Sequence, residues 1–135
     1  MKHLFIFISV LFIMACANKN YTKRCEDLKK GKFGFLGNGT ERRYTIERND
    51  STQIETDETI GSVTEFNIKW PSPCEYQLTF KRHIKTGSDT SLVNRIYHPV
   101  RTTILKIGTD HYIFKSKIDG FDVELIDTMG ISKSF

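Results

Sequence analysis

The chain has 135 residues, of which 39% are apolar and 27% are charged, and its formal net charge is +4. This length suits one domain with a modest core and excludes a large multidomain enzyme. So small a positive charge also argues against a nucleic-acid-binding protein, which needs a strongly basic surface.

The first residues are typical of an export signal. Lys2 gives a positive start, and an apolar run follows from Leu4 to Met14. This run of about 11 residues is too short to cross a bilayer core, which needs roughly 20. It fits the apolar part of a signal peptide. We therefore expect residues 1–15 to be removed on export.

The end of this segment is similar to the bacterial lipobox, with Ile13, Met14 and Ala15 before Cys16. Cleavage before Cys16 would leave it carrying a diacylglyceryl thioether and an N-acyl chain, and two or more chains anchor a protein stably. The alternative is ordinary signal-peptidase cleavage after Ala17. We expect lipidation of Cys16 and anchoring at the outer membrane, facing the periplasm, because no acidic residue directly follows Cys16.

Lipidation of Cys16 leaves Cys25 and Cys74 as an even pair. An oxidising periplasm permits a disulfide between them. Closing a loop of about 50 residues contributes about 4 kcal/mol in the chain-entropy model. A metal site is disfavoured because the two cysteines lie far apart and no CxxC or Cys/His spacing accompanies them.

Residues 16–30 form the lipid anchor and a polar tether, with one helical turn predicted around residues 25–30. The stretch 19–43 holds eight basic and three acidic residues, whereas residues 44–135 have a net charge of −2. We expect this basic stretch to be a solvated tether. The alternative is contact with anionic lipid head groups.

From Gly31 onward, short alternating segments separated by turn residues predict antiparallel strands. In the best hairpin, Phe66, Ile68 and Trp70 share one face of the first strand, and alternate residues of the second strand face the same side. The predicted strands cover residues 32–35, 43–48, 52–58, 63–70, 74–82, 92–97, 101–107, 111–117 and 121–126.

These segments predict an all-β domain over residues 31–135. About eight strands in an antiparallel meander suggest a small barrel or half-barrel of lipocalin-like form, and a two-sheet sandwich is the alternative. Short turns between neighbouring strands favour the barrel, with Tyr76, Leu78 and Phe80 in its core.

The sequence contains no GxSxG elbow, phosphate-binding loop or HxH spacing. We therefore predict no catalytic residues, metal or cofactor, and we expect His83, His98 and His111 at the surface or rim. Paired carboxylates could serve hydrolysis, but we expect the strand acids to face outward as solubilising charges. These acids are Glu47, Glu55, Asp57, Glu58 and Glu65.

Arg48 differs from the other charged residues because it shares a strand face with Tyr44 and Ile46. We expect it at the barrel rim, or inside and paired with Gln53 or Glu55. A buried arginine among aromatic rings can orient an anionic ligand. Arg48 is therefore the candidate ligand-orienting residue.

Several stretches together resemble small lipoproteins of Bacteroidetes, especially flavobacteria. They are Cys25, Gly31-Lys32-Phe33, Tyr44-Thr45-Ile46-Glu47-Arg48, Gln53-Ile54-Glu55, Trp70 and Cys74-Glu75-Tyr76-Gln77-Leu78. The resemblance implies an envelope lipoprotein and brings no activity with it. A label related to DNA topoisomerase, carried by some members, has no support in an exported chain of this size.

The expected function is that of a cell-envelope lipoprotein acting as a binding or accessory module, held on a membrane through Cys16. Its expected partners are a small ligand or an envelope protein, and no nucleic acid. The alternatives are a structural or assembly partner that acts through its surface, and an envelope hydrolase.

Overall fold

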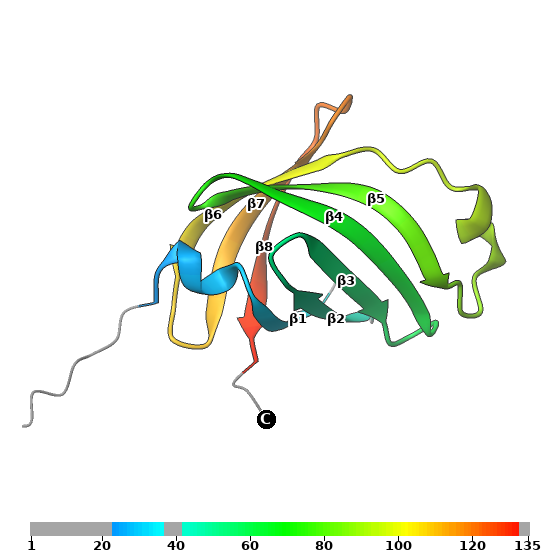
Figure 1. Ribbon diagram of the computed structural model, residues 1–135, viewed down its shortest axis with the longest axis horizontal. Coiled ribbons are helices and arrows are strands. Elements are labelled where there is room, and N and C mark those ends of the chain that lie inside the picture. Colours follow the sequence, from blue (N-terminus) through cyan, green and yellow to red (C-terminus); the bar gives the residue numbers. More distant parts are fainter. Residues whose placement is uncertain (1–22, 37–41, 133–135) are drawn as a thin grey trace, which may run out of the picture.

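The structure is a computed structural model that describes residues 23–36 and 42–132, so the predicted signal peptide and Cys16 lie outside the described residues. Each strand pairs antiparallel with its sequence neighbours, and β1 also pairs with β8, which closes the sheet into a barrel (Figure 1). The predicted all-β meander is confirmed, in its barrel form.

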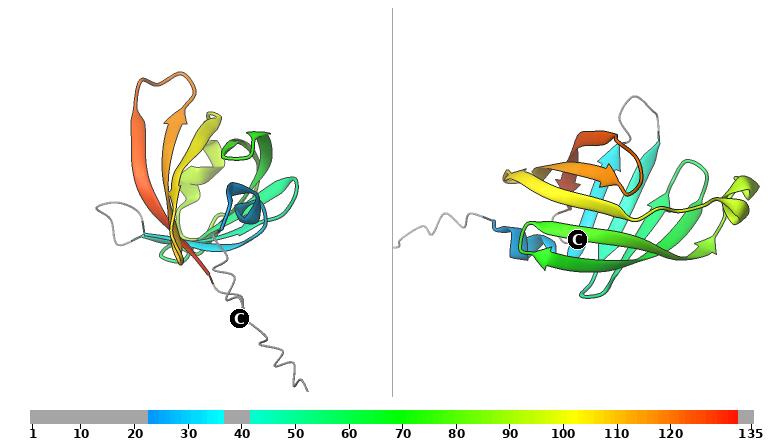
Figure 2. Two further views of the ribbon diagram at one scale, coloured as in Figure 1. Left: turned by 90° about the vertical axis from the view of Figure 1, so that its left-hand side faces the viewer. Right: turned by 90° about the horizontal axis from the view of Figure 1, so that it is seen from above.

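The strands are β1 (Gly31–Leu36), β2 (Arg43–Arg48), β3 (Thr52–Asp57), β4 (Ser62–Ser72), β5 (Glu75–Lys85), β6 (Val100–Ile107), β7 (His111–Ile118) and β8 (Glu124–Ile131). Two 3-10 helices accompany them, η1 (Cys25–Leu28) and η2 (Thr90–Asn94). The right-hand view of Figure 2 shows β4 and β5 crossing over β1 to β3. No helix among the described residues has the length and apolar character needed to cross a membrane.

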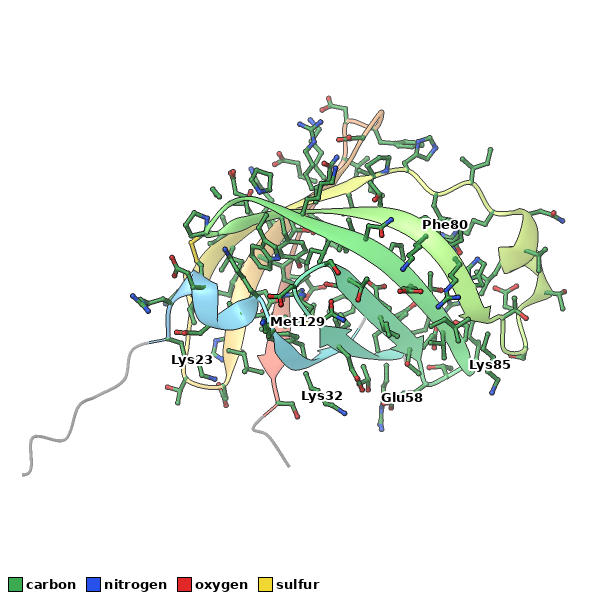
Figure 3. All side chains as sticks on the ribbon, in the orientation of Figure 1. Lys23, Lys32, Glu58, Phe80, Lys85 and Met129 are labelled. Carbon is green, nitrogen blue, oxygen red and sulfur yellow. A yellow bond between two sulfur atoms is a disulfide. The ribbon has the colours of Figure 1, made fainter. Side chains whose placement is uncertain are left out.

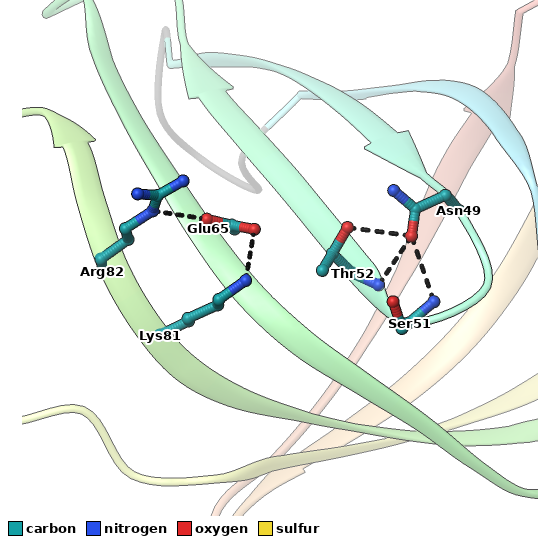
Figure 4. A network of polar contacts seen from close by, with 6 residues as sticks. All are labelled: Asn49, Ser51, Thr52, Glu65, Lys81 and Arg82. Atoms are coloured by element: carbon teal, nitrogen blue, oxygen red, sulfur yellow. Dashed lines mark hydrogen bonds and ion pairs between the residues drawn. The ribbon is translucent and has the colours of Figure 1, made fainter.

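Local side-chain chemistry fixes the β2–β3 turn (Figure 4). The side-chain oxygen of Asn49 accepts hydrogen bonds from the backbone N–H groups of Ser51 and Thr52 and from the Thr52 hydroxyl. An asparagine that satisfies the next backbone groups in this way replaces the ladder bonds that end at a turn. The sequence turn predicted at residues 49–50 is therefore present.

The outer face of the β4–β5 pair carries a charged cluster, also drawn in Figure 4. Glu65 accepts from Lys81 at 2.9 Å and from Arg82 at 2.6 Å. These two cations cover the glutamate, which is only 7% exposed. The two hydrogen bonds hold the pKa of Glu65 below its ordinary value.

One sequence prediction of the fold is wrong. Residues 92–97 were expected to form a strand, but the chain here forms η2 and then an extended segment without a sheet partner among the described residues. Asp89 starts η2 by accepting from the Ser91 N–H at 3.0 Å. Only Leu92 of this helix is buried, so a strand here would bury little apolar surface. One helical turn satisfies the backbone hydrogen bonds locally instead.

The last strand also differs from its expected position. It spans Glu124–Ile131 rather than residues 121–126. Residues 119–123 form the β7–β8 connection, which projects above the barrel body in Figure 1. Leu125, Asp127 and Met129 alternate along the strand, and this alternation indicates which face of β8 points into the barrel.

The barrel has two ends. The closed end carries η1 and the β2–β3, β4–β5 and β6–β7 turns, whereas the mouth carries the β3–β4 turn, η2 and the β7–β8 connection. Figure 1 shows η1 and η2 at opposite ends of the molecule. In Figure 3, Phe80 lies on the half of β5 nearer to η2, and Met129 lies beneath the β4–β5 layer.

Candidate functional site

Arg48 occupies the centre of the closed end and is only 5% exposed. Its Nε donates to the Gln53 side-chain oxygen at 2.6 Å, and its Nη1 donates to the Leu28 carbonyl of η1 at 3.3 Å. Its Nη2 donates to the hydroxyls of Tyr76 and Tyr112 at 2.8 and 2.9 Å. Arg48 therefore joins β2, β3, β5, β7 and η1 in one network.

Aromatic rings surround the guanidinium of Arg48. Its central carbon lies 4.6 Å from the Phe33 ring centroid and 4.5 Å from that of Tyr76, within the range of cation–π attraction. Burial works against the charge, but Tyr76 and Tyr112 outweigh it, and the pKa of Arg48 stays above its ordinary value. Burial also raises the pKa of Tyr112, so its hydroxyl stays protonated. The closed end thus holds one permanent positive charge.

Of the two positions expected for Arg48, the rim or the interior, the structure shows the interior one, with Gln53 as a partner. Four of its five N–H donors engage the protein's own acceptors. This geometry supports a structural role in closing the barrel. That Arg48 orients an anionic ligand stays a prediction.

A second polar side chain, Glu55, extends this network toward the middle of the barrel. Gln53 donates from its amide nitrogen to Glu55 at 2.6 Å while its oxygen accepts from Arg48. Burial raises the pKa of Glu55, although Gln53 and Arg48 favour its ionised form. Glu55 keeps partial solvent exposure despite its interior position.

The expectation that the strand acids all face outward is wrong for Glu55 and Asp57. Both share the inward face of β3 with the buried Gln53. Asp57 caps the β3–β4 turn by accepting from the N–H groups of Thr59 and Ile60. Polar residues occupy both faces of β3 almost equally. The sequence pattern of this strand therefore does not indicate which face points into the barrel.

The inner face of the sheet changes from buried to exposed along two cross-strand rows. In one row, Leu78 pairs with Val100 and Val100 pairs with Ile118, which is 41% exposed. These residues share the strand faces that point into the barrel, because alternation puts them in phase with buried neighbours.

The second row shows the same change. Tyr76 pairs with Thr102, Thr102 with Ser116, and Ser116 with Leu125. Tyr76 and Thr102 are buried, whereas Leu125 is 42% exposed. Four residues closer to the closed end on each strand, Tyr112 and Met129 pair across β7 and β8 and are both buried. The inner face is thus filled at the closed end and open at the mouth.

The seam between β1 and β8 closes the barrel. Its pairs in the described residues are Phe33 with Ile131 and Gly34 with Gly130, at the closed-end side of β8. The part of β8 that carries Leu125 and Asp127 pairs with β7 but with no part of β1 that the structure describes. The described part of the seam therefore lies on the closed-end side of β8.

Asp127 lies on the inner face between buried Met129 and exposed Leu125. Its Oδ1 accepts from the Thr128 N–H at 2.7 Å, but its Oδ2 is buried and has no hydrogen-bond partner. A buried polar atom without a partner costs free energy. The burial of this Asp127 oxygen is therefore unfavourable, and the packing around it does not explain why an aspartate stands here.

Aromatic side chains line the other side of the mouth. Tyr97 stacks on Phe80 with ring centroids 4.4 Å apart, and Phe66 meets both rings edge-on. His83 lies within hydrogen-bond distance of Thr64 at 3.2 Å and of Tyr97 at 3.2 Å. These contacts fasten the segment after η2 against β4 and β5.

The three histidines lie at the surface or toward the rim of the barrel, as expected. His98 and His111 are exposed, whereas His83 is half-buried in the contacts just described. No group of three His, Cys, Asp or Glu side chains within residues 23–36 and 42–132 could hold a metal ion.

Cys25 and Cys74 form a disulfide with their Cα atoms 5.0 Å apart, as predicted. It attaches η1 to the β4–β5 turn, and Leu28 of η1 is fully buried beneath the Arg48 network. The lipidation predicted at Cys16 lies outside the described residues.

A surface pocket of about 390 Å³ lies beside β1 at the closed end, over Phe33 and Ile131. Two lysines line it, but Lys30 pairs with Asp50 at 2.8 Å and Lys32 pairs with Glu47 at 3.0 Å. Exposed ion pairs of this kind contribute little to the stability of the fold.

No family model, curated protein or solved structure matches the chain. The resemblance to Bacteroidetes lipoproteins therefore stays a prediction.

Proposed function

We propose that the protein is a lipid-anchored binding module of the bacterial cell envelope and that a small, partly apolar ligand enters the mouth of its barrel. The lipobox-like segment before Cys16 and the Cys25–Cys74 disulfide support the envelope location. The basic stretch 19–43 follows the proposed anchor directly, where anionic lipid attracts it.

The graded exposure of the inner face carries the ligand-binding proposal. Ile118 and Leu125 face the inside of the barrel and remain exposed. Contact between such apolar side chains and water is unfavourable, so a ligand that covers them gains free energy of binding. The mouths of β-barrels are among the preferred places for small-molecule sites. The closed end fixes the wall geometry because the Arg48 network is buried there.

Two neighbouring residues on β8 give a matched test of the binding proposal. Leu125 lies on the inner face, whereas Ile126, which is 57% exposed, lies on the outer face. Binding of N-phenyl-1-naphthylamine, an uncharged probe whose fluorescence rises in apolar surroundings, should weaken about tenfold in Leu125→Lys, because the cation must then be desolvated.

The same change in Ile126→Lys should leave probe binding unchanged. Equal weakening in both variants, or no probe binding to the wild-type protein at all, would contradict the mouth as a ligand site. Weakening in neither variant despite strong binding would point to the outer surface and to a protein partner instead.

The anchoring proposal has its own experiment. Cells that produce the full chain are grown with a clickable fatty acid, and incorporation into the wild-type protein is compared with incorporation into Cys16→Ser. Label in the wild type alone supports lipidation at Cys16. An unlabelled mature chain that begins at Asn18 would show ordinary signal-peptidase cleavage instead.

A further inference from the structure

We propose that the outer half of β5, residues 79–85, binds an extended acidic segment of a partner protein, which adds to the sheet as a further strand. This strand edge is distinct from the inner face, where the proposed small ligand would bind. An unpaired backbone edge, an excess of positive charge and a neighbouring segment without backbone hydrogen bonds to the edge together support the proposal.

The backbone of β5 has strand partners on both sides over only part of its length. On one side, β5 pairs with β4 from end to end. On the other side, its pairs with β6 stop at Leu78, which lies opposite Val100. In the chain between β5 and β6, which the structure describes throughout, residues 79–85 therefore find no strand partner on that side. Alternate residues of an antiparallel strand direct N–H and C=O to one edge, so this edge offers a row of donors and acceptors.

The segment that follows η2 does not form a ladder with this edge. Figure 1 and the right-hand view of Figure 2 show the chain from η2 to β6 diverging from β5. Side chains hold it from the inner side, where the Tyr97 ring stacks on that of Phe80 at 4.4 Å. Within this fully described stretch, no backbone hydrogen bond joins residues 95–99 to residues 79–85. The main-chain groups of the edge thus stay free for another strand.

Pro99 explains why the chain leaves the sheet at this point. It directly precedes Val100, the first β6 residue that pairs with β5. Proline has no N–H, so no ladder bond can form from its nitrogen. Its carbonyl accepts from the Asp119 N–H at 2.8 Å, which ties this end of the segment to the end of β7. The protein's own chain therefore leaves the β5 edge beyond Leu78 unpaired.

Positive charge accumulates along the same edge. Residues 79–85 contain Lys81, Arg82 and Lys85 and no acid. Glu65 of β4 accepts from both Lys81 and Arg82, at 2.9 and 2.6 Å, so it balances only one of these three charges (Figure 4). The side chains of Lys81 and Arg82 remain 43% and 66% exposed, and Lys85 is exposed as well. The outer side of the edge is therefore basic and accessible.

This charge decides which kind of strand fits the edge. A second copy of the chain would bring the three cations of one β5 against those of the other, and like charges opposite one another are unfavourable. Residues 86–99 do not change the balance, since Asp89 and Arg95 carry opposite charges. A strand whose outward residues are aspartate or glutamate meets complementary charge instead. Main-chain hydrogen bonds would hold such a segment, as in other cases of strand addition.

Three labelled peptides of about nine residues test the proposal. One alternates glutamate with valine, one alternates lysine with valine, and one is the glutamate peptide with backbone N–H groups methylated along both edges. Fluorescence anisotropy measures their binding to the purified full-length protein at low salt, where exposed charges act most strongly. The glutamate peptide should bind at least about tenfold more tightly than the lysine peptide. Methylation should weaken its binding about tenfold, because main-chain donors are lost.

Lys85→Glu and Lys106→Glu form a matched pair of variants. Both lysines are exposed, but Lys85 ends β5 at the free edge, whereas Lys106 lies on β6 beside the closed-end turn. Lys85→Glu should weaken binding of the glutamate peptide about fivefold, and Lys106→Glu should change it by less than about twofold. Both should keep the wild-type unfolding midpoint. Hydrogen–deuterium exchange should show new protection within residues 79–85 when the peptide binds.

Several results would overturn the proposal. They are no binding of the glutamate peptide, equal binding of the lysine or methylated peptide, and equal effects of Lys85→Glu and Lys106→Glu. Dimers that protect residues 79–85 without peptide would show that a second copy occupies the edge instead. The uncharged naphthylamine probe reports separately on the mouth, and Lys85→Glu should leave its binding unchanged. Failure of the small-ligand proposal and failure of strand addition are therefore distinguishable.

Discussion

Replacing Arg48 by methionine should lower the free energy of unfolding by about 3–5 kcal/mol, the range found when one partner of a buried charged network is removed. The substitution deletes four hydrogen bonds and leaves the Leu28 carbonyl, the Gln53 oxygen and two tyrosine hydroxyls without their donor. Each buried group left unpaired costs about 1–3 kcal/mol, and losing the desolvated charge offsets part of the total.

Urea unfolding measures this change, with Trp70 as the fluorescent reporter because its ring lies 4.9 Å from that of Tyr76 in the same region. With a slope near 1.5 kcal/mol per molar urea, the midpoint should fall by roughly 2–3 M. Tyr112→Phe provides the graded comparison. It keeps the ring and removes one of the two hydroxyls on Nη2, so it should cost about 1 kcal/mol.

An Arg48→Met protein within about 1 kcal/mol of the wild type would refute this reasoning, because the network would then contribute no more than one ordinary hydrogen bond. If its unfolding midpoint is unchanged while probe binding is lost, Arg48 serves the ligand rather than the barrel. Equal losses in Arg48→Met and Tyr112→Phe would show that Tyr112, and not the guanidinium, organises the closed end.

The remaining predictions concern the disulfide and two glutamates. Reducing the Cys25–Cys74 bond should lower the free energy of unfolding by about 4 kcal/mol in the chain-entropy model, and equal urea midpoints with and without reductant would contradict this. Glu55→Gln should stabilise the protein at pH 7 but not near pH 4. Burial raises the pKa of Glu55, so the folded state disfavours its carboxylate. That carboxylate forms in the unfolded chain as pH rises above about 4.3, and the glutamine variant avoids the resulting loss of stability. Glu65→Gln should destabilise the protein at pH 7, and its effect should vanish as pH falls through the lowered pKa that two hydrogen-bonded cations give Glu65. Midpoints measured across this pH range that change with the same sign in both variants would show that one of the two environments is wrongly assigned.

Alternation predicted most strands because one face of each is covered by core. Phe66, Ile68 and Trp70 share a face in the structure as in the sequence, and so do Tyr76 and Leu78. The stretch 92–97 misled because its apolar residues include Val93 and Ile96, which are exposed. Apolar content without a partner strand does not make a strand, and a capped helical turn satisfies this backbone locally.

The interior polar residues could be predicted only in part. Arg48 stood out because it is in phase with the apolar residues of β2. Gln53 and Glu55 gave no such signal, since β3 is polar on both faces and only its pairing to β2 and β4 turns one face inward. Asp127 was missed because the predicted last strand ended before it.

The sequence by itself determined the signal-like start, the even cysteine pair, the meander and most strand phases, because these depend on residue type and spacing along the chain. Only the tertiary structure decided which end of the barrel is closed and where the inner face stays exposed. The reason is that a closed end needs residues from five separate elements to meet at one guanidinium. The pairing of β1 with β8 that closes the barrel is likewise a long-range relation that no local pattern encodes.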